Sequence, residues 1–178
     1  MLRNNTACDN LAAVENLLSN TELDIRFIDG EQVVMLDNEN VNGLIRTPEA
    51  SMMASAVSAK PVVREFLLGM QRRLAEKNNV VMDGRDIGTV ILPNAQVKIF
   101  LTADDTERAM RRYKELQEKG STVTFKEVLD DLIVRDYNDS HREIAPLKPA
   151  EDSVVINTTG NTLEQSIELI VKTIKERM

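Results

Sequence analysis

Three short runs rich in β-forming residues, separated by stretches with helical patterning, constrain the fold of this chain more than any other feature. They are "NVVMD" (79–83), "VKIFLTA" (97–103) and "SVVINTT" (153–159). The first two lack the polar alternation of half-exposed strands, which is typical of strands buried on both faces of a parallel sheet. Strands that alternate with helices predict an α/β domain built on such a sheet.

Helix signals fill the intervals between these runs. Residues 104–120 begin with acidic side chains and end at Gly120, as the helix dipole and a glycine cap require. Two capping-box pairs predict the starts of the next two helices. These pairs are Thr124 with Glu127 and Thr162 with Gln165.

The first 78 residues have a different character. Residues 10–20 space their apolar side chains helically, and the apolar–polar alternation on both sides of Asp29-Gly30 predicts a hairpin. Two helices are expected between residues 47 and 78, the second opening at Pro61. The hairpin therefore indicates a small antiparallel insert in the α/β domain.

Size and charge exclude several classes of protein. A chain of 178 residues suits one main domain. The net charge of −7 disfavours a surface for nucleic acid or anionic lipid, and no apolar run approaches the length of a membrane span. Cys8 is the single cysteine, so no internal disulfide is possible; we expect a buried thiol, no metal site and a reducing cytoplasm.

The loop "DGRD" directly follows the first apolar run. Ligands of open α/β sheets bind beyond the carboxyl ends of the strands, so polar side chains here face a ligand. Arg85 suits a phosphate or carboxylate, and Asp83 or Asp86 suits an amine or a cation. The alternative is an Arg-Asp pair that closes a surface turn.

Two helices carry arginines at helical spacing. One face holds Arg108, Arg111 and Arg112, which suits either a nucleotide phosphate or simple pairing with Glu107 and Glu115 in solvent. The second face holds Arg135, Asp139 and Arg142, which suits either a surface ion pair or two arginines aimed at an anion by one acid. His141 lies beside this face, and we interpret it as structural or solvent-exposed.

Two long segments of the chain together resemble a known family. "MDGRDIGTVILPNAQVKIFLTADDTERAMRRYKELQEKG" and "RDYNDSHREIAPLKPAEDSVVINTT" are together similar to the bacterial cytidylate kinases. Those are P-loop nucleoside monophosphate kinases that phosphorylate CMP or dCMP with ATP and Mg2+. The resemblance implies a single domain over 1–178, with a CMP-binding insert at about 21–60 and a lid at about 104–142. It also implies that the full-length form works as a monomer.

The resemblance also implies roles for single residues. Ser55, Arg64 and Asp86 match positions at the cytosine ring, and Arg85 and Arg142 match arginines that hold the CMP phosphate. Near the sugar lie the counterparts of Arg135 and Asp139, and the counterparts of Arg108, Arg111 and Arg112 lie in the lid over ATP. Arg85, Arg142 and Arg135 are the expected catalytic residues.

One family element is not found. A P-loop requires GxxxxGK[ST], and none of the seven glycines is followed by lysine. The resemblance implies that the P-loop and the first strands, roughly 40 residues, are missing from this sequence. We therefore expect a sheet with a gap, a sheet closed over that gap, or a gap filled by another chain.

Three hypotheses about function stay open. The first is a cytidylate kinase that, as these 178 residues alone, is nearly inactive, because phosphoryl transfer depends on the phosphate cradle. The second is a non-catalytic module that binds CMP. The third is a complementing fragment that needs a partner for the missing strands.

Overall fold

The structure is a computed structural model that describes residues 1–45, 47–58 and 60–178, with the backbone alone at positions 48, 51 and 55. The chain is mixed α/β, with a small antiparallel sheet and a parallel pair of strands. Its contacts divide it into two compact units, Met1–Val81 and Met82–Met178, which are described separately. The single-domain organisation stays a prediction.

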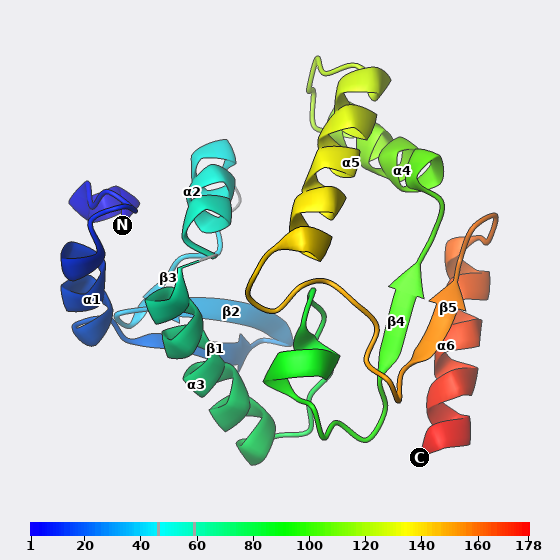
Figure 1. Ribbon diagram of the computed structural model, residues 1–178, viewed down its shortest axis with the longest axis horizontal. Coiled ribbons are helices and arrows are strands. Elements are labelled where there is room, and N and C mark those ends of the chain that lie inside the picture. The colour runs from blue at the N-terminus through cyan, green and yellow to red at the C-terminus, as the bar shows by residue number, and fades with distance from the viewer. Residues whose placement is uncertain (46, 59) are drawn as a thin grey trace. The chain divides into compact units, whose positions relative to one another are not determined.

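The first unit contains helices and a small antiparallel sheet (Figure 1). Its elements are η1 (Leu2–Asn4), α1 (Leu11–Ser19), β1 (Leu23–Ile28), β2 (Glu31–Leu36), β3 (Glu39–Asn40), α2 (Pro48–Ser58) and α3 (Pro61–Lys77). Pro61 occupies the first turn of α3, as predicted, because its missing N–H has no helical partner there. The apolar side chains buried in this unit are Val14, Val33, Met35, Val41 and Val63.

Two tight turns shape the hairpin sheet. Asp29 and Gly30 both have positive φ, 54° and 82°, the geometry that matches the twist of paired strands, so the predicted hairpin is confirmed. A second turn at Asp37 and Asn38, with φ of 50° and 64°, pairs β2 with β3. The sequence reasoning missed this turn, although Asp and Asn are the side chains that best tolerate such a backbone.

The second unit is the α/β part of the chain (Figure 1). Its elements are η2 (Ile87–Ile91, a π-helical turn), β4 (Ile99–Thr102), α4 (Asp105–Glu118), α5 (Phe125–His141), β5 (Val154–Asn157) and α6 (Leu163–Arg177). Strands β4 and β5 pair in parallel, from Ile99 opposite Val154 to Thr102 opposite Asn157. Helices α4 and α5 form the connection between them, and they pack on each other.

The predicted helix ends of this unit are confirmed. Both capping boxes are present, with the Thr124 and Thr162 side chains each accepting a backbone N–H three residues on. Gly120, with φ of 78°, follows the end of α4. Ala109 and Val128 are buried, and Tyr113 meets Phe125 edge to face at 6.1 Å between ring centroids.

Two predictions about strands are wrong. Residues 79–83 form no strand, and Val81 is 99% exposed. A parallel strand is stable only beside neighbours that take its backbone hydrogen bonds, and among the described residues no strand pairs with this run. β4 does form, but it is not buried throughout, because Leu101 is 54% exposed. In a sheet of two strands one partner cannot cover both faces and edges.

The structure also bears on the cysteine, on membrane-spanning helices and on the expected gap in the sheet. Cys8 is a free thiol, half-buried rather than buried. No helix in the described part of the chain combines the length and the apolar composition needed to cross a membrane. Of the three expected states of the sheet, closure of 79–83 onto β4 is not seen in the described ranges.

Candidate functional site

The loop 83–86 leads directly into the π-helical turn η2. The carbonyl of Asp86 accepts hydrogen bonds from the N–H groups of Val90 and Ile91, at 2.9 and 3.2 Å, so Asp86 starts the turn. A Cβ at Gly84 would lie 3.0 Å from the Ile87 side chain, closer than ordinary packing allows. Glycine at position 84 therefore lets the loop fold back tightly enough to bury Asp86.

Asp86 is a buried acid that faces an arginine. Its side chain is 9% exposed, and Oδ1 lies 3.6 Å from Nη2 of Arg142, at the C-terminal end of α5. Arg142 Nε donates to the carbonyl of Ala145 at 2.6 Å. Arg142 Nη2 is buried and has no hydrogen-bond partner among the described residues. Ala145 therefore fixes the arginine at Nε, while the N–H groups of Nη2 make no hydrogen bond to a described residue.

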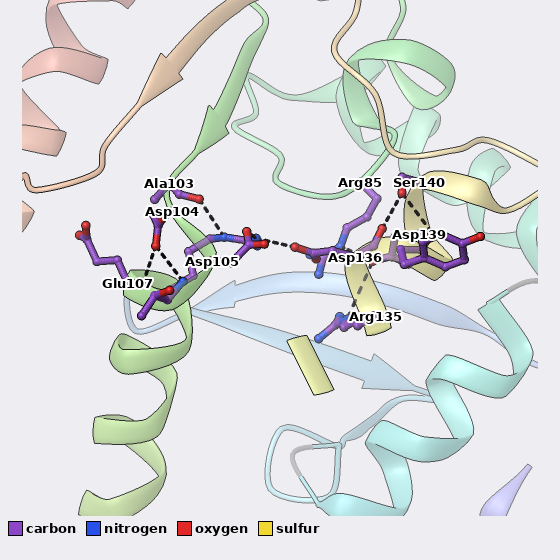
Figure 2. A network of polar contacts seen from close by, with 12 residues as sticks. Arg85, Ala103, Asp104, Asp105, Glu107, Arg135, Asp136, Asp139 and Ser140 are labelled. Atoms are coloured by element: carbon purple, nitrogen blue, oxygen red, sulfur yellow. Dashed lines mark hydrogen bonds and ion pairs between the residues drawn. The ribbon is translucent and has the colours of Figure 1, made fainter. Parts of the chain in front are cut away.

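A second acid, Asp139, is shared by two arginines (Figure 2). Arg85 Nε donates to Asp139 Oδ2 at 3.0 Å, and Arg135 Nε lies 3.9 Å from the same oxygen. Asp139 is 22% exposed, whereas Arg135 is 69% exposed. The predicted pairing of Arg135 with Asp139 along one helix face is present. The contact with Arg85, from a loop 54 residues away, was not predicted.

The arginines of α4 are all paired with acids. Arg108 Nη2 lies 2.5 Å from Asp136 of α5 and 2.5 Å from Asp105, and its Nε donates to the Ala103 carbonyl at 3.1 Å (Figure 2). Burial opposes the charge of this guanidinium, but the hydrogen bonds to the two carboxylates outweigh it and raise the pKa of Arg108. The remaining two pair as the solvated alternative predicts, Arg111 with Glu107 and Arg112 with Glu115.

Glu107 connects the start of α4 to the turn after β5. Its Oε2 accepts the Gly160 N–H at 2.7 Å, and Arg111 donates to both Glu107 and the Thr158 carbonyl. The hydrogen bond from Gly160 lowers the pKa of Glu107, and the contact with Arg111 adds to that effect against the opposing effect of burial. The carboxylate of Glu107 therefore favours its charged form in the folded chain.

Two candidate residues belong to the first unit. Ser55 lies on α2, but its side chain is outside the described part of the chain. Arg64 lies on α3, and its Nη1 is 3.4 Å from the Ser58 carbonyl.

His141, at the end of α5 in the second unit, is exposed and stacks on Tyr137 with 4.0 Å between ring centroids.

Sequence reasoning did not identify every charged side chain that shapes this region. It missed Asp136, which pairs with Arg108, and the pair of Lys98 with Asp152. Each of these contacts joins segments 28 or more residues apart. Helical spacing carries no signal for such a contact, so only opposite charge could have suggested it. In the described ranges, no three Asp, Glu, His or Cys side chains are arranged to hold a metal ion.

Comparison with known proteins gives one family. A family model described as "Cytidylate kinase" matches residues 1–176. A cytidylate kinase of Caldicellulosiruptor bescii is 46% identical over 172 residues, which cover 97% of this chain and 76% of the relative. Those of Carboxydothermus hydrogenoformans and Lactobacillus johnsonii are each 43% identical, with 97% and 98% of this chain and 78% and 76% of the relative covered.

The match runs through every segment that carries the charged side chains described above. It includes the loop before η2, helix α4 with its paired arginines, and helix α5. The chain spans about three quarters of the length of these relatives. The chain belongs to the cytidylate kinase family and is thus a nucleoside monophosphate kinase, a phosphotransferase.

Proposed function

We propose that this chain binds CMP or dCMP and serves the transfer of the ATP γ-phosphoryl group to it, giving CDP or dCDP. One observation carries the proposal: Arg142 has a buried Nη2 without a hydrogen-bond partner among the described residues. A buried donor left unsatisfied is costly, and native proteins keep few of them. The phosphate of a nucleotide offers the charged oxygen atoms that such a donor needs.

Arg85 is the second phosphate ligand in this proposal. Its side chain is 41% exposed, and Asp139 holds it at Nε, which leaves the other guanidinium nitrogens available to a ligand. A guanidinium presents its donors in a planar fork that matches a phosphate. Arg85 and Arg142 together therefore supply two positive charges to hold the phosphate that accepts the transferred group.

The aspartates supply the remaining contacts of the nucleotide. A carboxylate at Asp86 can accept a hydrogen bond from the exocyclic amine of cytosine, whereas the corresponding carbonyl of uracil would repel it. Ser55 and Arg64 of the first unit complete the set of base ligands in this proposal. Asp139, with Arg135 beside it, accepts from a sugar hydroxyl.

This chain has fewer candidate residues for binding ATP, the phosphoryl donor, than for binding CMP. The sequence contains no GxxxxGK[ST] motif to cradle ATP, and the lid candidates Arg108, Arg111 and Arg112 are each paired with an acid. Mg2+ is the metal that accompanies ATP in such a transfer. We expect the 178 residues alone to turn over slowly while they bind CMP. The proposal includes action in the cytoplasm, without nucleic acid or membrane partners, and a full-length form that is a monomer.

Calorimetric titration of this chain with CMP and UMP tests the proposal. We expect CMP to bind at least tenfold more tightly than UMP, since a polar site rejects a ligand that leaves its groups unpaired. Arg142→Met should weaken CMP binding by about 10- to 100-fold, because hydrogen bonds to charged groups contribute about 1.5–3 kcal/mol. Arg177→Met, an exposed arginine in the last turn of α6, is the matched control and should change CMP binding less than twofold.

Two results would contradict the proposal. Equal affinity for CMP and UMP would remove Asp86 from base recognition. Equal effects of Arg142→Met and Arg177→Met would remove Arg142 from phosphate binding. A coupled assay of ADP release separates the alternatives, because a module that only binds CMP shows the affinity without turnover, whereas rapid turnover by this chain would refute the expected low activity.

A further inference from the structure

Lys98 is a nearly buried lysine directly before β4 that the proposed function does not use. Its side chain is 7% exposed, and Nζ donates to both carboxylate oxygens of Asp152, at 2.8 and 2.7 Å. Nζ also donates to the carbonyl of Pro93. The hydrogen bond from Lys98 lowers the pKa of Asp152, so that carboxylate favours its charged form.

The lysine stem also lies close to the turn η2. A Cβ at Gly88 would lie 3.4 to 3.7 Å from the Cδ, Cγ and Cβ atoms of Lys98. The stem therefore passes Gly88 at the distance that one added methyl group would fill. Lys98 supports η2 at its second residue and, through Pro93, just beyond its end.

The two segments that Lys98 joins both lead to the candidate nucleotide site. The first segment runs from Asp86, through η2, to Pro93. The second runs from Arg142, at the end of α5, to Asp152. The second segment has no regular secondary structure between residues 142 and 153. Asp86 and Arg142 are the two side chains that meet at 3.6 Å.

The sheet itself does not need the Lys98 side chain. The backbone carbonyl of Lys98 accepts the Val154 N–H at 2.9 Å, and this bond continues the parallel ladder. The side chain pairs instead with Pro93 and Asp152, which both lie in connections, and its stem lies close to Gly88 of η2. A buried ammonium group is stable only when it is paired, so Lys98 ties the carbonyl of Pro93 to the carboxylate of Asp152.

We propose that Lys98 is a positioning residue for nucleotide binding: it fixes η2 and the segment before β5 so that Asp86 and Arg142 face each other. This inference rests on the proposed function, since it assigns the effect to the CMP site. It concerns geometry, so the lysine itself touches no ligand. A residue that holds binding groups in place changes affinity without contributing a contact, because small misplacements of such groups weaken binding.

The test compares Lys98→Met and Asp152→Asn with the parent chain and with a matched control. Lys172→Met is the control, since Lys172 pairs with Glu176 on the exposed surface of α6. The first readout needs no nucleotide. It is hydrogen exchange at the amides of Val90 and Ile91, together with the NMR signal of Arg142 Nε–H, which donates to Ala145.

We expect exchange at these two amides to rise about tenfold in both test variants and the Arg142 signal to shift, with the amides of α6 unchanged. CMP affinity, measured at a temperature at which every variant is folded, should fall about tenfold in both. Lys172→Met should leave all three readouts as in the parent. If Lys98→Met fails to fold, Asp152→Asn provides the same comparison with the lysine still present.

Separate results overturn the two proposals. If the parent does not bind CMP, the proposed function fails, and exchange at η2 still decides whether Lys98 positions Asp86 and Arg142. If exchange and the Arg142 signal match the control, the inference fails whatever the parent binds. It also fails if exchange rises equally throughout the second unit, because that would reflect general destabilisation, or if the parent binds CMP and the variants bind it equally well.

Discussion

The pair of Arg108 and Asp136 should couple α4 to α5 by about 1 kcal/mol. The guanidinium and carboxylate lie 2.5 Å apart with side chains 32% and 27% exposed, between a surface pair and a buried one. Exposed pairs contribute about 0.2–1 kcal/mol, and breaking buried pairs costs about 3–5 kcal/mol. Asp105 also holds Arg108 and remains after Asp136 is removed, which moves the expected value toward the lower range.

A double-mutant cycle of Arg108→Ala and Asp136→Ala measures this coupling. Urea unfolding can be followed by tyrosine fluorescence, because the only tyrosines, Tyr113 and Tyr137, lie on α4 and α5 and the chain has no tryptophan. The signal therefore reports the helix pair. The coupling should weaken in 1 M salt, where the Debye length is about 3 Å, without disappearing, since the pair is partly buried.

The control cycle uses Lys172→Ala and Glu176→Ala. That pair is 3.9 Å apart and 71% and 64% exposed, so its coupling should not exceed about 0.5 kcal/mol. A coupling for Arg108 and Asp136 no larger than the control would refute the reasoning. It would mean that the apolar contact of α4 with α5 is sufficient and that the ion pair adds no stability.

Three further changes have expected outcomes. The hydrogen bond from Gly160 lowers the pKa of Glu107, so the charged Glu107 stabilises the fold above its ordinary pKa of 4.5, and this stabilisation is lost as pH falls through the lowered folded value. The urea midpoint of Glu107→Gln should therefore change less between pH 6 and pH 3 than that of the parent. An unchanged pH profile would contradict this reasoning. Thr124→Ala removes a cap and should cost about 1 kcal/mol by urea unfolding, unlike Thr124→Ser. Gly84→Ala forces a Cβ against Ile87, so it should cost about 1–3 kcal/mol and weaken CMP binding; a neutral effect on both would show that the loop adapts.

The helix ends and the hairpin could be predicted from sequence because the interactions that form them are local. A capping box joins residues three apart, as at Thr124 and Glu127, and the turn at Asp29-Gly30 depends on those two residues alone. The run 79–83 shows the limit of such reasoning. Its composition favours a strand, but a strand also needs a partner, and composition carries no information about whether one is present.

The candidate site was predicted in part for the same reason. Helical spacing brings Arg135 to Asp139, and the structure contains that pair. Arg85 reaches the same carboxylate only because the loop before η2 folds beside α5, which depends on the packing of the whole unit. Family resemblance could name both arginines as ligands of one nucleotide, but it could not show that they share an acid.

The sharing of Asp139 by two arginines has a consequence for how this sequence can change over evolutionary time. Replacing Arg85 leaves the carboxylate beside Arg135, and replacing Arg135 leaves it hydrogen-bonded to Arg85. Replacing Asp139 removes the common partner of both at once. In terms of these contacts, a substitution at Asp139 costs two interactions and a substitution at either arginine costs one, so a lasting change at Asp139 requires compensation at both arginines.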